Sequence, residues 1–170
     1  TNSYTFRWDT SSGTLSDGTY YATLSGTDLA GNAYSAGTQS ITFTVDSSSP
    51  TVTITTSDSD NVVNVSQVVT ITAGFSETMS ATPTISITGI VTNVIMTPVS
   101  GTNSYTFRWD TSSGTLSDGA YYATVSGTDS NGNAYSAGTQ SITFTVDSST
   151  PTVTITTCLL YTSDAADDLL

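Results

Sequence analysis

The sequence predicts an all-β protein, an antiparallel β-sandwich, on three observations. Apolar residues recur at every second position in short runs, which is the pattern of a strand with one buried and one wet face. Clusters of Gly, Asn, Asp and Ser separate these runs and are typical of turns. No segment shows a helical period, and Thr, which suits a pleated strand surface, is abundant. Two sheets packed face to face satisfy this pattern.

Seven strands are expected in the central part of the chain. Pro98 is expected to end or kink the fourth, and Trp109 shares one face of the fifth with Tyr105 and Phe107. That shared face places Trp109 in the core rather than on the surface as a platform for sugars. Arg108, on the opposite face, is expected to pair with an acidic neighbour. The predicted strands are 51–56, 68–75, 83–88, 90–99, 104–110, 120–128 and 140–147.

An internal repeat dominates the chain. Residues 1–56 match residues 102–157 at an offset of 101, which is the size of one small sandwich domain. Five positions differ: Thr19/Ala120, Leu24/Val125, Leu29/Ser130, Ala30/Asn131 and Ser49/Thr150.

A Ser-rich segment ending in Pro marks the predicted domain boundary, because such sequence is typical of a linker. It reads Val-Asp-Ser-Ser-Ser-Pro at 45–50 and returns at 146–151 with Thr150 in place of the third Ser. The predicted division is therefore a truncated domain at 1–46, a complete domain at 47–147 and the opening of a further domain at 148–157. We expect 1–46 to leave its apolar faces without a partner sheet, and 148–157 to fray or pair with an open edge.

The repeat ends abruptly at Cys158, where the first copy has Ser57. Residues 158–170 resemble a one-frame translation of the transposase adapter used for sequencing libraries, and we interpret them as an artefactual tail. The alternative is a genuine acidic tail. The distinction matters because the chain's one Cys lies there.

Composition argues against several functions. The formal net charge is −12 with 2 Lys+Arg and no His, so phosphate neutralisation, and with it nucleic-acid binding, is not expected. Anionic membranes are disfavoured as partners for the same reason, and no apolar run is long enough to insert. Acyl-transfer catalysis needs a nucleophile with a nearby base, and the inventory offers no His or Lys for that role. The prediction is that the protein is not an enzyme.

Several short motifs in order resemble the bacterial immunoglobulin-like (Big-type) domains that occur in tandem in large surface adhesins. They are Pro-Thr-Val-Thr-Ile at 50–54, Phe-Ser-Glu at 75–77, Asp118-Gly119 before Tyr121, and Asp129 with Gly132-Asn133. The resemblance covers residues 1–157. It implies an immunoglobulin-like antiparallel sandwich of about seven strands per 101-residue repeat, in which Tyr121 or Tyr122 forms a tyrosine corner.

The resemblance also implies a non-catalytic stalk or spacer module in an extracellular or cell-surface adhesin, with neighbouring repeats of the same chain as partners. The alternative is a carbohydrate- or surface-binding module accessory to a secreted enzyme. A glycan or surface ligand would then need exposed aromatic residues. The candidates are Tyr122 and Tyr135, with Tyr21 and Tyr34 in the other copy.

The residues establish no cofactor, and calcium is the sharpest chemical hypothesis that they offer. Asp58 and Asp60 lie in a loop after the first strand, and Asp46 and Asp147 lie at the two linkers. In a head-to-tail array these carboxylates could converge at a domain junction, where Ca²⁺ takes 6–8 oxygen ligands. Related adhesins have junctions stiffened by Ca²⁺. The alternative is that Asp58 and Asp60 only make a solvated turn.

The segment 129–133 also faintly resembles a calcium loop. The other copy has Ala30 where this one has Asn131, which removes one candidate oxygen ligand. The shared Asp, Gly and Asn are what a tight turn needs, so a turn is the preferred interpretation.

Overall fold

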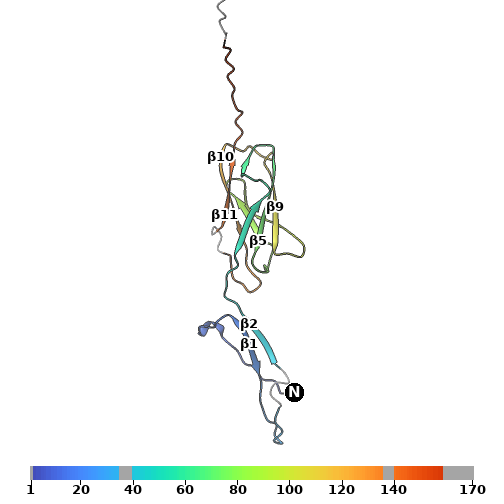
Figure 1. Cartoon of the computed structure of the whole chain (residues 1–170). Coiled ribbons are helices and arrows are strands. Elements are labelled where there is room, and N and C mark those ends of the chain that lie inside the picture. Colours follow the sequence, from blue (N-terminus) through green and yellow to red (C-terminus); the bar gives the residue numbers. More distant parts are fainter. Residues whose placement is uncertain (1, 35–39, 136–139, 159–170) are drawn as a thin grey trace, which may run out of the picture.

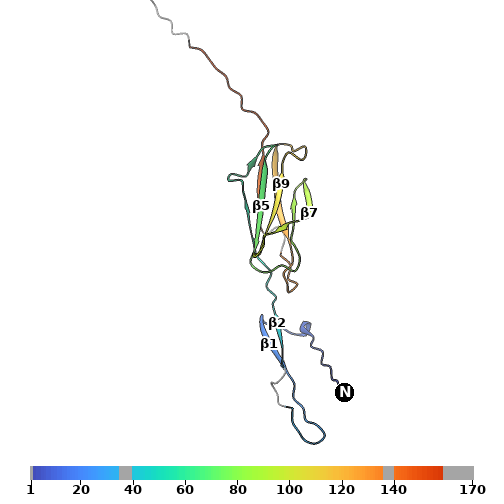
Figure 2. The same cartoon turned by 90° about the vertical axis from the view of Figure 1, so that its right-hand side faces the viewer.

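The structure is a computed structural model that describes residues 2–34, 40–135 and 140–158. Regular structure in these residues is almost entirely β, with eleven strands, one 3₁₀ turn (η1, Thr10–Ser12) and no α-helix. Figures 1 and 2 show the parts in a row: a pair of strands, a linker, a sandwich and an extended C-terminal segment.

The strand pair consists of β1 (Gly18–Thr23) and β2 (Ser40–Val45), which are antiparallel. The sandwich draws its strands from residues 52–146. It contains β3 (Val52–Thr56), β4 (Val62–Val63), β5 (Val68–Phe75), β6 (Thr84–Ile87), β7 (Val91–Ile95), β8 (Thr97–Pro98), β9 (Ser104–Asp110), β10 (Gly119–Ser126) and β11 (Ser141–Val146).

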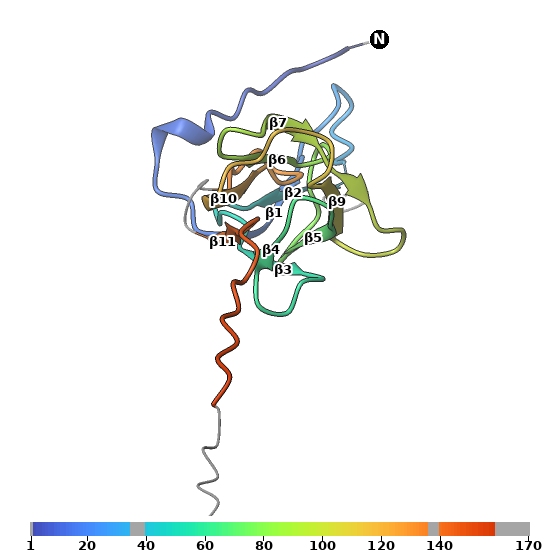
Figure 3. The same ribbon diagram turned by 90° about the horizontal axis from the view of Figure 1, so that it is seen from above.

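Two sheets face each other in the sandwich. One has the strand order β3-β5-β9-β8 and the other β4-β11-β10-β6-β7. Seen from above in Figure 3, β7, β6, β10 and β11 follow one side and β9, β5 and β3 the other. All pairings are antiparallel except β4 with β11. This order is that of an immunoglobulin-like fold, in which the first, second, fifth and fourth main strands share one sheet.

The seven predicted strands are all present, with one correction. The expected strand 90–99 is two strands, because the chain leaves one sheet at β7 and joins the other at β8. Met96 sits between them with a buried side chain, and its amide donates to the Pro83 carbonyl at 3.0 Å. A loose apolar run cannot reveal such a change of sheet, because both parts are apolar. The two-residue β4 was also not predicted.

The core lies between the sheets and follows the expected alternation. In β5 every second residue is buried, from Val69 to Phe75. Trp109 is 3% exposed, and its ring meets that of Phe144 edge-on at 5.3 Å between centroids. Trp109 is therefore a core residue, as predicted.

The two copies of the repeat differ in their surroundings. The register of β1 with β2, Gly18 opposite Val45, reproduces that of β10 with β11, Gly119 opposite Val146. Phe43 is nevertheless 38% exposed, whereas Phe144 at the equivalent position is fully buried. Among the described residues, no second sheet covers the apolar face of β1–β2. Residues 148–158 form no strand, and Val153 and Ile155 are exposed, which matches the expectation of a frayed segment.

Candidate junction site

The linker, Ser47–Pro50, is hydrogen-bonded to the segment that precedes it. The Asp17 Oδ1 atom accepts from the Ser47 amide at 2.8 Å and from the Ser47 hydroxyl at 2.7 Å. The Ser48 hydroxyl donates to Asp17 Oδ2 at 2.8 Å. These serine hydrogen bonds lower the pKa of Asp17. Ser148 meets Asp118 in the same way in the second copy.

Residues of the sandwich form hydrogen bonds with the chain immediately before and after the linker. Asn131 Nδ2 donates to Asp46 Oδ2 at 2.7 Å, and Asn133 Nδ2 donates to the Asp46 carbonyl at 3.1 Å. Just past the linker, the Thr51 amide donates to Ser76 Oγ at 2.9 Å. We call the linker together with Asp17, Asp46, Asn131 and Asn133 the junction. Hydrogen bonds therefore hold the chain just before the four-residue linker, at Asp46, and just after it, at Thr51.

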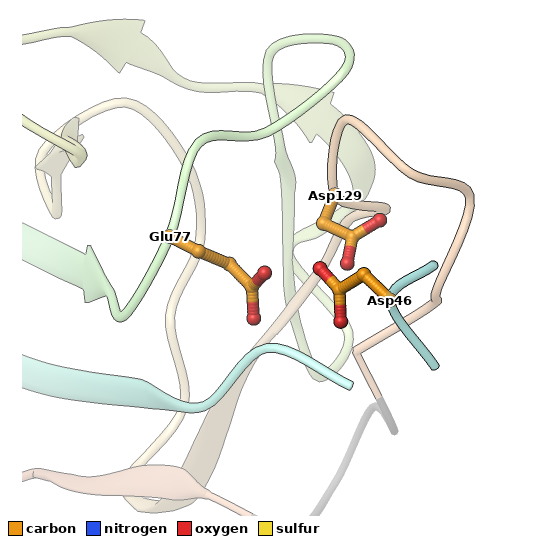
Figure 4. A group of neighbouring side chains, drawn as sticks. All are labelled: Asp46, Glu77 and Asp129. Carbon is orange, nitrogen blue, oxygen red and sulfur yellow. The ribbon is translucent and has the colours of Figure 1, made fainter. Parts of the chain in front are cut away.

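Three carboxylates gather at the junction. Asp46 follows β2, Glu77 lies in the loop after β5, and Asp129 follows β10; one oxygen of each lies within 4.8 Å of the others. Figure 4 shows the three groups turned toward one another. Asp46 and Glu77 are half-buried and Asp129 is buried. Oxygen ligands from three separate segments form a donor set that suits a hard cation such as Ca²⁺.

Asp129 is held by its own turn. Its Oδ1 accepts from the amides of Asn131 at 2.9 Å and Asn133 at 2.8 Å, and its Oδ2 accepts from Asn133 Nδ2 at 2.9 Å. Burial acts to raise the pKa of Asp129, but these hydrogen bonds outweigh it and the pKa is lowered. Asp28 makes the equivalent bonds to Ala30 and Asn32. Residues 129–133 therefore form a tight turn, and Asp129 of this turn is also one of the three junction carboxylates.

The pKa of Glu77 is raised, in contrast to that of Asp129. Desolvation raises its pKa first, and the negative charges of Asp129 and Asp46 raise it further. Because the pKa of Glu77 is raised and that of Asp129 is lowered, Glu77 takes a proton more readily than Asp129. A cation bound there would reverse this effect.

Asp58 and Asp60 lie at the opposite end of the sandwich. Their loop is placed by parallel pairing of β4 with β11 and by the Thr145 amide, which donates to the Asn61 carbonyl at 2.8 Å. Gln67 Nε2 donates to Asp58 Oδ2, while Asp58 Oδ1 and Asn61 Oδ1 are buried without a hydrogen-bond partner. The Val62 amide, at 3.0 Å from Asp60 Oδ1, lowers the pKa of Asp60.

Asp147 is at this far end too. Its amide donates to the Val63 carbonyl at 3.0 Å, and its carboxylate accepts from the side chain and amide of Ser149, which lower its pKa. The expected convergence of Asp46, Asp58, Asp60 and Asp147 therefore needs correction. Asp46 is separated from the other three by the length of the sandwich, and it lies beside Glu77 and Asp129 instead.

Sequence reasoning missed Glu77 and gave Asp129 only a local role. The available signal was the position of Glu77 as the one Glu of the chain, directly after a strand. Which end of the sandwich that strand reaches is a property of the topology, so spacing alone could not pair Glu77 with a linker residue 31 positions earlier.

The aromatic candidates for a glycan platform are not equivalent. Tyr122 is 50% exposed, but Tyr135 is buried, packs edge-on against Phe75 and accepts a hydrogen bond from the Gln140 amide at 2.9 Å. Tyr135 is therefore part of the core and not an exposed sugar contact. Tyr121 forms the tyrosine corner, donating to the Ser117 carbonyl at 3.0 Å. Arg108 pairs with Asp110 at 3.7 Å, as predicted.

A cavity of about 360 Å³ lies between the end of β10 and the segment before β6. Its lining consists of small residues, hydroxyl groups and Tyr135, with no carboxylate among the lining residues: Ser80, Ala81, Thr82, Thr84, Ser126, Gly127, Thr128, Ala134 and Tyr135. Such a lining offers no pair of groups for acid–base chemistry.

The fold defines a class: an immunoglobulin-like β-sandwich module, with three carboxylates gathered where the strand pair joins the sandwich. The chain belongs to the bacterial Ig-like domain (group 3) family, whose model matches residues 2–97 and 103–167. Domains of this family are generally non-catalytic structural modules and typically occur in extracellular or surface proteins. The chain matches no curated protein.

The second matched segment extends past Cys158, where the internal repeat ends. Cys158 is exposed, and the rest of the predicted artefactual tail, 159–170, lies outside the described residues. Within the described part of the chain, no helix has the length and apolar character needed to cross a membrane.

Proposed function

We propose that the chain is a stalk or spacer segment of a repetitive extracellular or cell-surface adhesin, in which each domain's partner is the neighbouring repeat. The observation that supports this best is the junction. Asp17 holds Ser47 and Ser48 from one side, and Asn131 and Asn133 hold Asp46 from the other. A linker restrained on both sides limits bending, which is what a spacer requires.

The charge of the chain supports the same role. With 14 Asp+Glu against 2 Lys+Arg, neighbouring copies repel one another, which keeps a dense array from associating laterally. The exposed edge of β7 carries Ile95, and such edges pair with other chains unless something opposes the approach. Net negative charge provides that opposition.

We further propose Ca²⁺ as the ligand of the junction carboxylates Asp46, Glu77 and Asp129. The residues fit: their oxygens lie within 4.8 Å of one another, and the pKa of Glu77 is raised first by desolvation and then by the negative charges of Asp129 and Asp46. The loop of Asp58 and Asp60 keeps a second donor set, because two of its buried oxygens have no partner. Asp147 occupies the same repeat position as Asp46 and would serve the next junction.

The test is small-angle scattering and thermal unfolding of two head-to-tail copies of residues 47–147, with Ca²⁺ and with a chelator. A stiff spacer gives an extended particle, and Ca²⁺ at the junction raises Tm through preferential binding to the folded state. Glu77→Gln in the second copy should remove the Ca²⁺ effect at that junction, while Asp60→Asn reports on the far loop. A flexible or collapsed particle in both buffers would overturn the proposed spacer function. A Tm that is the same with Ca²⁺ and with the chelator would overturn the proposed Ca²⁺ binding and leave the spacer function standing.

Carbohydrate binding is the second candidate, and Tyr122 is the observation that favours it. Tyr122 is 50% exposed on β10 and pairs across the sheet with Thr143, which is also exposed. A glycan array probed with the wild-type chain and with Tyr122→Ala separates the two functions, because a spacer gives no signal in either.

A further inference from the structure

Asn131 and Gly132 form the one Asn-Gly pair of the chain, and they lie at the junction. Both residues are exposed. Gly132 has φ +100, a conformation that side chains rarely adopt, and its amide donates to the Asp129 carbonyl through a long bond of 3.3 Å. An exposed Asn followed by Gly is the sequence most prone to spontaneous deamidation, because no side chain hinders attack by the following backbone nitrogen.

We propose that Asn131 is a deamidation site and that its conversion loosens the junction. The Gly132 nitrogen attacks Asn131 Cγ, a C–N bond forms, and the side-chain nitrogen leaves as ammonia. The succinimide then takes up one water and opens to aspartate or isoaspartate. The step needs no oxidant, reductant or cofactor.

The turn itself does not depend on the Asn131 side chain. The equivalent turn at Asp28 has Ala30 in that place, and it keeps the same three hydrogen bonds to its Asp at 2.8–2.9 Å. The Asn131 side chain is instead used across the junction, where it donates to Asp46 Oδ2. Conversion to aspartate should therefore leave the turn intact and act on the junction, whereas isoaspartate also lengthens the backbone of the turn by one atom.

The product replaces a donor with an acceptor. A carboxylate at position 131 cannot donate to Asp46, and it adds negative charge beside Asp46, Glu77 and Asp129, which already lie together. Like charges at close range repel. Repeats with Asn at this position would age toward a looser junction, whereas repeats with Ala would not. This consequence rests on the proposed spacer function, although the chemistry does not.

The chemistry is tested by incubating the full chain in mildly alkaline buffer and following each Asn by peptide mass spectrometry. We expect Asn131 to convert several-fold faster than Asn2, which is also exposed but is followed by Ser. Asn131→Ala, the residue of the other copy, should remove the fast product. Conversion of Asn2 while Asn131 remains an amide would overturn the proposal.

The consequence is tested with divalent cations removed by a chelator, by NMR relaxation of the Ser47, Ser48 and Ser49 amides. Asn131→Asp should increase their mobility more than Asn131→Ala, and high salt should abolish the difference between the two variants. Equal mobility of Asn131→Asp and Asn131→Ala at low salt would overturn the charge effect. A wild-type linker already as mobile as residues 148–157 would instead overturn the spacer function and leave the mass-spectrometric result standing.

Discussion

At the residue scale, identical residues behave differently in the two copies because their neighbours differ. Trp109 is 3% exposed and contacts both Tyr121 and Phe144. Trp8, its equivalent, keeps the ring contacts with Tyr20 and Phe43 but is 39% exposed. Local aromatic contacts are thus formed by the two strands and their preceding segment, and burial is added by the facing sheet.

This difference makes Trp8 a matched control for Trp109. Trp109→Ala should lower the free energy of unfolding of the sandwich by about 3–5 kcal/mol, the range for removing a buried aromatic side chain. Trp8→Ala should leave that transition unchanged. Urea unfolding followed by far-ultraviolet circular dichroism measures both, and equal losses for the two variants would contradict the assignment of the core.

At the element scale, residues at the ends of the strands, and not those on their faces, form the hydrogen bonds that hold the linker. The Asp-Gly pair before β1 holds the linker after β2, and the same pair before β10 holds Ser148 after β11. The residue just before one strand therefore anchors the segment that leaves its partner strand, in both copies of the repeat.

Asp17→Ala should free Ser47 and Ser48 and increase their backbone mobility in NMR relaxation. The loss of three hydrogen bonds to one carboxylate is the physical reason. Asp118→Ala removes the equivalent contacts to Ser148 and leaves the junction untouched, so it serves as the control. A linker equally mobile in wild type and Asp17→Ala would show that Asp17 does not restrain it.

At the scale of the whole molecule, carboxylates from three separate segments meet at the junction. Glu77 has a raised pKa in the folded state through desolvation and through the charges of Asp129 and Asp46. Folding thus favours protonated Glu77. The stability that this proton contributes is fully present below the unfolded pKa and is lost as pH rises through the raised folded pKa.

Glu77→Gln should therefore raise the urea midpoint at neutral pH in the presence of a chelator, because it removes a charge that the fold disfavours. The gain should shrink as pH falls through the raised pKa of Glu77, where the wild type becomes neutral as well. Asp110→Asn is the control, since the pKa of Asp110 is lowered by Ser112 and the loss of its charge should not stabilise. Destabilisation by Glu77→Gln at neutral pH without cations would contradict this account.

The sequence by itself determined the all-β class, six of the seven predicted strands and the core position of Trp109. These features follow from period-two alternation, turn residues and an internal repeat. Such patterns can be read within short segments or by comparing the sequence with itself. Tertiary structure alone decided the change of sheet at Met96, the burial of Tyr135 and the meeting of Asp46, Glu77 and Asp129. Strand periodicity specifies which face a side chain takes, but the order of strands in the sheets specifies which loops share an end. Loop contacts between distant residues, and therefore the junction site, depend on that order.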